Sequence, residues 1–163
     1  MKKVLVSMVL ACSAWVILSG CASSEERAAR AAEQAAKVTK ALEARDYKIA
    51  VSRMYPMKGS SRSVSYGYSV EVRNDSLISY LPYFGGAYNV PYGGGKGLNF
   101  SERIGSYRES QKNKGERQIE INVTNEEDTY IYLIKVFSNG NSSIDVTSRQ
   151  RDHISYSGEL EVK

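Results

Sequence analysis

Apolar and polar residues alternate with a period of two along most of this 163-residue chain. Every second residue between 63 and 73 is apolar or aromatic, and residues 116–124 repeat the pattern. Because successive side chains of a strand point to opposite faces, this pattern predicts strands with one buried face. Residues 130–137 are apolar at nearly every position, which predicts a central strand buried on both faces.

Turn residues separate the predicted strands. Asn139-Gly140 is a strong hairpin signal, because both residues accept a positive φ. Strands joined by such hairpins must be antiparallel. The sequence therefore predicts an all-β, mainly antiparallel meander that closes as a barrel or folds over as a sandwich, with one N-terminal α-helix. The predicted strands are residues 47–55, 63–73, 76–81, 98–107, 116–124, 129–138, 142–149 and 153–162.

The first residues have the composition of a bacterial export signal. Two lysines precede a nearly unbroken apolar stretch, residues 4–18, which is too short to span a membrane as a helix. Residues 18–21, Leu-Ser-Gly-Cys, match the lipobox of bacterial lipoproteins at all four positions. We therefore expect residues 1–20 to be a signal peptide that is removed. Acyl chains such as palmitate are then expected to anchor the mature chain through Cys21.

Residues 21–45 are expected to form a lipidated tether and a helix. Ser24 is a suitable N-cap for the segment that follows, which is rich in alanine and charged residues. A narrow apolar stripe recurs at helical spacing: Ala28, Ala31, Ala35, Val38 and Leu42. We favour a spacer helix that docks its C-terminal end over a short coiled coil. Residues 46–163 are then the antiparallel β domain.

The composition excludes several classes of function. Cys12 leaves with the signal peptide, so no disulfide is expected in the mature chain. Removal of Lys2 and Lys3 lowers the formal net charge from +4 by two, which gives no reason to expect a nucleic-acid partner. Residues 126–128, Glu-Glu-Asp, lack EF-hand spacing and are expected to be a solvated turn. We expect no metal ion and no cofactor.

No catalytic residue is predicted. His153 is the only histidine, and we expect Asp152 and Ser155 to lie on the opposite face of the strand from it. Asp145 is an open candidate as its acidic partner, but the Gly-x-Ser-x-Gly nucleophile elbow is missing. A histidine-dependent hydrolase is therefore disfavoured, and the chain is expected not to be an enzyme.

One long connection breaks the meander and is rich in aromatic and glycine residues. This aromatic loop, residues 80–97, carries Tyr80, Tyr83, Phe84, Tyr88 and Tyr92. Its rings could stack on sugars or grip a peptide. They could also cover the open end of the sheet as a structural plug. The plug is favoured, because aromatic residues of a small disulfide-free domain often belong to the core, but the two roles are compatible.

Four segments resemble the pattern of a family of small bacterial lipoproteins, domain of unknown function 4251. They are residues 80–88 (Tyr-Leu-Pro-Tyr-Phe-Gly-Gly-Ala-Tyr), 91–95 (Pro-Tyr-Gly-Gly-Gly), 98–100 (Leu-Asn-Phe) and 154–158 (Ile-Ser-Tyr-Ser-Gly). The similarity covers residues 40 to 163. The resemblance implies a lipoprotein of the bacterial envelope, and it implies no established activity, substrate or catalytic residue.

These observations predict a non-catalytic envelope module that binds a protein, peptide or glycan through the aromatic loop. One alternative is a barrel that holds a small apolar ligand. Another is a carboxylate-dependent hydrolase, which needs two acidic groups in one cleft. Ala22 after the lipidated cysteine is compatible with the outer membrane, and Glu25 and Glu26 are compatible with surface display. We therefore expect an outer-membrane anchor, on the periplasmic face or the cell surface.

Overall fold

The computed structural model describes residues 24–88, 96–113 and 115–161. The chain divides into two compact units, residues 1–30 and 31–163. The described part of the first unit is the beginning of helix α2 (Ser24–Glu43). Cys21 and the predicted signal peptide lie outside the described residues. Among the described residues, no helix is both long enough and apolar enough to span a membrane.

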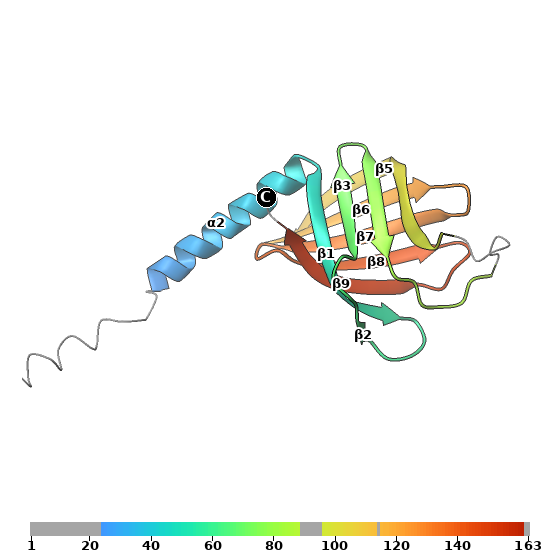
Figure 1. Ribbon diagram of the computed structural model, residues 1–163. Coiled ribbons are helices and arrows are strands. Elements are labelled where there is room, and N and C mark those ends of the chain that lie inside the picture. The colour runs from blue at the N-terminus through green and yellow to red at the C-terminus, as the bar shows by residue number, and fades with distance from the viewer. Residues whose placement is uncertain (1–23, 89–95, 114, 162–163) are drawn as a thin grey trace, which may run out of the picture. The chain divides into compact units, whose positions relative to one another are not determined.

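Among the described residues of the second unit, eight antiparallel strands form a closed barrel (Figure 1). They are β1 (Asp46–Pro56), β3 (Ser69–Arg73), β4 (Ser76–Leu81), β5 (Leu98–Asn113), β6 (Glu116–Thr124), β7 (Thr129–Phe137), β8 (Asn141–Ser148) and β9 (Ile154–Glu161). Each strand pairs with the next, and β1 closes the ring by pairing with both β3 and β9. A short strand, β2 (Arg62–Ser63), pairs with β1 beyond the end of β3. The predicted all-β antiparallel class with one N-terminal helix is confirmed.

The predicted strand at 63–73 is wrong in its middle. The chain leaves the ladder between β2 and β3, where Gly67 has a φ of 108° and Tyr66 is 99% exposed. The alternation of apolar residues there therefore does not mark one continuous buried face. β2 and β3 pair with β1 on either side of a bulge in β1, where the pairing with β9 shifts register between Val51 and Arg53.

Two further expectations about strands also fail. β7 is buried on one face only, because Ile131 and Phe137 are each 42% exposed while the alternate residues face the interior. β5 continues to Asn113, well beyond the predicted residue 107. Its second half is made of polar and charged residues, which carry no apolar alternation to predict a strand.

Tyrosine rings and aliphatic side chains fill the interior of the barrel. The largest fully buried side chains include Tyr47, Tyr130, Tyr132 and Tyr156. Phe100 stacks on Tyr130 with ring centroids 4.9 Å apart. Burial raises the pKa of the Tyr132 and Tyr156 hydroxyls, so both remain protonated donors at neutral pH.

Two buried hydroxyls of the core, those of Tyr132 and Ser79, form a chain of hydrogen bonds. Tyr132 Oη donates to Ser79 Oγ at 2.9 Å, and Ser79 Oγ donates to the Leu98 carbonyl at 2.7 Å. This chain of hydrogen bonds ties β7, β4 and β5 together inside the barrel. It also avoids the cost of burying an unpaired hydroxyl.

The C-terminal half of α2 packs on the end of the barrel where β1 begins. Val38 and Leu42, the last two positions of the predicted apolar stripe, are 3% and 0% exposed. Val38 and Val136 of β7 line the same cavity. The Arg45 guanidinium lies 4.3 Å from the centre of the Tyr107 ring, which fixes the turn between helix and barrel.

Candidate functional site

The opposite end of the barrel carries the aromatic loop and the turns that follow β6 and β8. The loop is held against the β8–β9 turn by backbone hydrogen bonds. Tyr88 N–H donates to the Gln150 carbonyl at 2.8 Å, and Asp152 N–H donates to the Gly86 carbonyl at 3.0 Å. Ala87 and Arg151 form a bridge between the same two segments. The described part of the loop is therefore fixed to the barrel.

Tyr83 contributes to closing this end of the barrel. Its ring packs against the core, and its hydroxyl donates to the Gly86 carbonyl at 2.7 Å. Tyr156 Oη, from inside the barrel, donates to the Pro82 carbonyl at 2.8 Å. The Arg151 guanidinium lies 5.4 Å from the centre of the Tyr83 ring. This arrangement is the structural plug considered from the sequence.

Three other aromatic residues of the loop project into solvent. Tyr80, Phe84 and Tyr88 are 52%, 45% and 74% exposed. The Tyr80 ring stacks on Tyr68 with centroids 5.0 Å apart, and the Arg62 guanidinium lies 4.1 Å from the centre of the Phe84 ring. Tyr92, the fifth predicted residue, lies outside the described residues. The loop thus combines one aromatic ring that helps to close the barrel, Tyr83, with other aromatic rings that are exposed to solvent.

A groove runs between the loop and the chain that follows β1. This aromatic groove has a volume of about 360 Å³ and is lined by Lys58, Tyr83, Phe84, Gly85, Gly86 and Asp152. Because the two glycines have no side chain, the loop backbone can lie close to neighbouring side chains. A Cβ on Gly85 would lie only 2.6 Å from Tyr83 Oη. The groove therefore offers two rings, an ammonium group, a carboxylate and accessible backbone.

Asp152 holds the exposed side of the groove in place. Its Oδ1 accepts a hydrogen bond from Tyr88 Oη at 2.6 Å, and its Oδ2 accepts one from Gly86 N–H at 3.0 Å. The Tyr88 hydroxyl, followed by the Gly86 N–H, lowers the pKa of Asp152. The carboxyl is therefore ionised at neutral pH and fixes the orientation of the Tyr88 ring.

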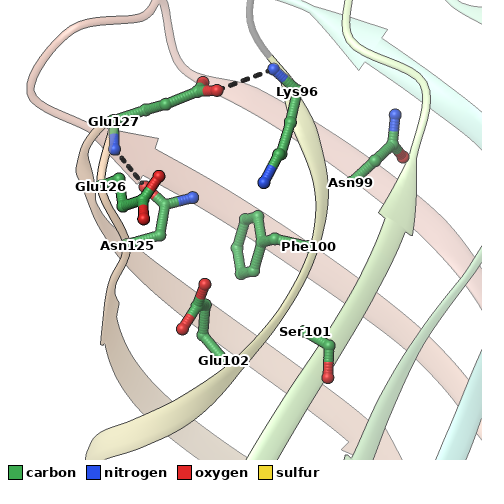
Figure 2. Close-up of a pocket in the computed structure, with 8 residues that line it drawn as sticks. All are labelled: Lys96, Asn99, Phe100, Ser101, Glu102, Asn125, Glu126 and Glu127. Atoms are coloured by element: carbon green, nitrogen blue, oxygen red, sulfur yellow. Dashed lines mark hydrogen bonds between the residues drawn. The ribbon is translucent and has the colours of Figure 1, made fainter.

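A second cavity lies beside the aromatic loop and was not predicted from the sequence. This Phe100 pocket has a volume of about 200 Å³ (Figure 2). Its lining residues are Lys96, Asn99, Phe100, Ser101, Glu102, Asn125, Glu126 and Glu127. In Figure 2 the Lys96 ammonium, the Asn125 amide and the Glu102 carboxylate surround the Phe100 ring. Two carboxylates that line one cavity, Glu102 and Glu126, are what the hydrolase alternative requires.

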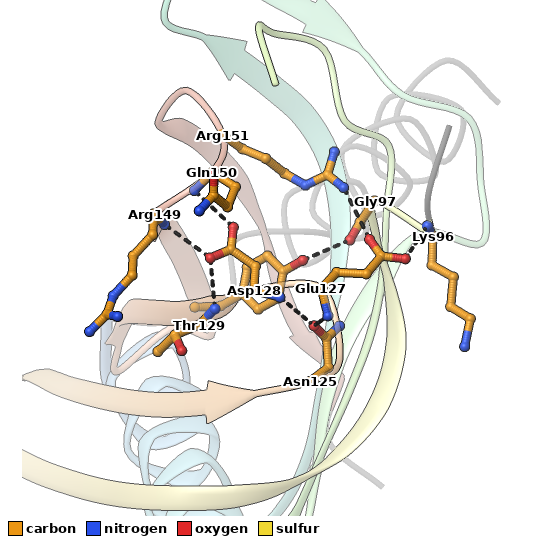
Figure 3. Close-up of polar contacts among 10 residues, drawn as sticks. Lys96, Gly97, Asn125, Glu127, Asp128, Thr129, Arg149, Gln150 and Arg151 are labelled. Atoms are coloured by element: carbon orange, nitrogen blue, oxygen red, sulfur yellow. Dashed lines mark hydrogen bonds and ion pairs between the residues drawn. The ribbon is translucent and has the colours of Figure 1, made fainter. Parts of the chain in front are cut away.

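The wall of the Phe100 pocket is held by a dense network of hydrogen bonds (Figure 3). Asn125 Oδ1 accepts the backbone N–H groups of Glu127 and Asp128, both at 2.9 Å. Glu127 accepts the Lys96 backbone N–H at 2.9 Å and pairs with the Arg151 guanidinium at 3.2 Å. The expectation of a solvated acidic turn is therefore wrong for Glu127, which is paired on two sides.

Asp128 is also not solvated. It is 8% exposed and accepts three backbone N–H groups, from Thr129 at 2.7 Å, Arg149 at 3.2 Å and Gln150 at 3.0 Å. These bonds join the β6–β7 turn to the β8–β9 turn (Figure 3). Because Arg151 and Asp152 continue the same segment, the Phe100 pocket and the aromatic groove share one rigid support.

His153 and Ser155 lie on the same face of the barrel, contrary to the expectation from the sequence. Residues two apart in a strand face the same side, and His153 Nε2 lies 3.0 Å from Ser155 Oγ. Ser155 Oγ donates to Asp145 Oδ1 at 2.6 Å, while His153 Nδ1 lies 3.2 Å from Thr147 Oγ1. Asp145 Oδ1 accepts the serine hydroxyl and also lies 3.8 Å from His153 Nε2, the same ring nitrogen that faces Ser155 Oγ. In a catalytic triad the acid instead contacts the ring nitrogen that faces away from the serine.

Among the described residues, no group of three or more His, Cys, Asp or Glu side chains is arranged to hold a metal ion.

No curated protein matches the chain. A crystal structure of a DUF4251 family protein from Bacteroides eggerthii has a similar fold, with a TM-score of 0.60 and 13% sequence identity. The match covers 78% of this chain and 87% of that one. A family model, Domain of unknown function (DUF4251), matches residues 29–160. The chain belongs to the DUF4251 family.

Proposed function

We propose that this chain is a bacterial envelope lipoprotein, anchored in the outer membrane through Cys21, whose barrel is a non-catalytic binding module. The lipobox at residues 18–21 supports the anchor. The helical residues 31–43 join the barrel at the end opposite to the aromatic groove.

The exposed rings held on a rigid base carry the proposed binding role. Tyr88 is 74% exposed and yet fixed by Asp152, and Phe84 is 45% exposed and covered on one side by Arg62. Exposing such rings costs hydration free energy that binding would recover. Fixing them before binding lowers the entropic cost of association.

The chemistry of the aromatic groove favours a glycan partner. Sugar rings present apolar C–H faces that stack on aromatic rings, and hydroxyl groups that hydrogen-bond to charged groups. Lys58 and Asp152 line the same groove as Phe84 and Tyr83, so both kinds of contact are available within one site. A volume of about 360 Å³ accommodates one or two sugar units.

The test is binding of the mature chain, made soluble by Cys21→Ser, to peptidoglycan and surface polysaccharide purified from the producing bacterium. Phe84→Ala and Tyr88→Ala should each weaken binding about tenfold, because a stacked ring contributes about 1–1.5 kcal/mol. Ile131→Ala is the matched control, since Ile131 is exposed to a similar degree on β7. Absence of glycan binding, or equal binding by all variants, would refute a glycan-binding groove.

The two alternatives are less well supported. A small apolar ligand would need space inside the barrel, which tyrosine and aliphatic side chains occupy. A carboxylate-dependent hydrolase would use Glu102 and Glu126 in the Phe100 pocket. Release of reducing sugar or of new amino groups from the same envelope polymers would support it, provided that Glu102→Gln abolishes the activity.

A further inference from the structure

We propose that the Phe100 pocket binds a small zwitterion that carries both an ammonium and a carboxylate group, of the size of an amino acid. The pocket shares no lining residue with the aromatic groove, so this proposal does not depend on the glycan-binding role. It rests on the charges, the aromatic floor, the rigid wall and the volume of the pocket.

The pocket combines charges of both signs. Glu127 is neutralised by Arg151, so the charged groups available to a ligand are those of Lys96, Glu102 and Glu126. Among the described residues, the structure shows no ion pair for these three side chains, although all of them line one cavity. A ligand with an ammonium group between the two glutamates and a carboxylate near Lys96 would satisfy all three charges.

The floor of the pocket suits the ammonium end of such a ligand. The Phe100 ring stacks on Tyr130 on its buried side and lines the cavity. An aromatic face attracts a cation with a strength of about 0.5–2 kcal/mol, depending on how far the contact is shielded from water. The Asn125 amide beside the ring can donate to the ligand's carboxylate, since its oxygen already accepts two backbone N–H groups.

The size and rigidity of the pocket restrict the ligand further. Pockets for drug-sized molecules have volumes of about 300–1,000 Å³. A cavity of about 200 Å³ holds an amino acid or the end of a short peptide instead. The bonds of Asn125 and Glu127 fix the wall before binding, so little entropy is lost on ordering it.

The test is an NMR titration of the ¹⁵N-labelled mature Cys21→Ser chain with alanine, aspartate and lysine. At least one of them should shift the amide signals of residues 99–102 and 125–127 in a saturable way. The methyl ester and the N-acetyl derivative of that amino acid lack one charge each and should bind at least about tenfold more weakly, a loss of about 1.4 kcal/mol. The corresponding dipeptide separates the two sources of this chemistry. Tighter binding of the dipeptide assigns the site to a peptide, and tighter binding of the amino acid assigns it to the free compound.

Substitutions of the lining residues test whether the NMR shifts come from binding in the Phe100 pocket. Glu102→Gln together with Glu126→Gln should weaken binding of the zwitterion at least tenfold. Lys96→Met should remove the preference for the zwitterion over its methyl ester. Glu161→Gln, at the opposite end of the barrel, is the control and should bind normally. Unchanged melting temperatures exclude misfolding. The proposal is overturned if no amino acid gives saturable shifts, or if the ester and the N-acetyl derivative bind as tightly as the zwitterion.

Discussion

Two carboxylates, Asp128 and Asp152, organise the loops at the groove end of the barrel. Together they accept four backbone N–H groups and one tyrosine hydroxyl from segments far apart in the sequence. Charged acceptors form stronger hydrogen bonds than neutral ones, so these residues can fix loops that have few apolar contacts. Each is a positioning residue for the loops that line the aromatic groove and the Phe100 pocket.

Asp152 makes the stability of the protein depend on pH in a direction that can be tested. Its pKa in the folded chain is lowered, first by the Tyr88 hydroxyl, below the ordinary value of 3.8. The stabilisation is therefore complete above about pH 4 and is lost as the pH falls through the lowered pKa. Tyr88→Phe removes the main cause of the shift. The variant should melt at a lower temperature than the parent at pH 7, and the difference should shrink as the pH falls through the lowered pKa of Asp152.

Thermal unfolding followed by circular dichroism between pH 2 and pH 7 measures this effect. Tyr80→Phe is the control, because it removes a hydroxyl from another exposed ring without touching Asp152. A difference between parent and Tyr88→Phe that stays constant over the whole range would contradict the assignment to Asp152.

The roles of individual residues in the aromatic loop and the Phe100 pocket could not all be predicted from the sequence. The five aromatic residues were recognised as one group, but only the structure separates Tyr83, which helps to close the barrel, from the exposed Tyr80, Phe84 and Tyr88. The Phe100 pocket could not be predicted, because Lys96 and Glu126 come from different loops whose distance depends on the register between β5 and β6. No local pattern encodes such a distance.

Helix α2 and the barrel strands were predictable to different degrees. The helix was recognisable from its cap, its composition and its stripe, and its last apolar residues pack on the barrel. β4 and β6 match their predicted ranges, because turn residues or a proline bound them. Alternation of apolar and polar residues also runs through β6. β5 does not match its predicted range, because its second half pairs with β6 through a polar sequence. In that stretch, backbone pairing with β6 holds the chain as a strand, and burial of apolar side chains does not.

The C-terminal half of α2 should stabilise the barrel through Leu42. This side chain is fully buried, so Leu42→Ala removes apolar contacts and leaves a cavity, at a cost of about 3 kcal/mol in the free energy of unfolding. Urea denaturation of the soluble mature chain measures the change. Lys37→Ala is the matched control on the same helix, since it breaks only an exposed pair with Glu33 and should leave the unfolding midpoint almost unchanged. An equally small effect of Leu42→Ala would mean that the helix does not stabilise the barrel.

The proposed anchor acts on the molecule as a whole. Cys21→Ser removes the thiol that would carry the acyl chains, so the variant should lose palmitate labelling and move from the membrane fraction to the soluble fraction. Cys12→Ser, within the predicted signal peptide, is the control and should leave both properties unchanged. Membrane association of Cys21→Ser that resists salt and alkaline washing would contradict anchoring by lipid alone.

Barrel or sandwich closure was left open by the sequence, and the reason lies in the contact of the first strand with the last. That contact depends on Gly158, where any Cβ would clash with the Ala50 carbonyl oxygen. A glycine in a strand usually signals a bulge or a close approach of backbones, but it does not identify the partner. Only the structure shows that this close approach joins β9 to β1.

The pairing of β1 with β9 determines when the barrel can close during synthesis of the chain. Lys48 lies opposite Glu161, so nearly all of the domain must leave the ribosome before the pairing of β1 with β9 can form. Until then both edges present unpaired backbone groups, which are templates for aggregation. Bringing such distant segments together is also slow. A chain of this topology is therefore exposed to aggregation until β9 has been made and has paired with β1.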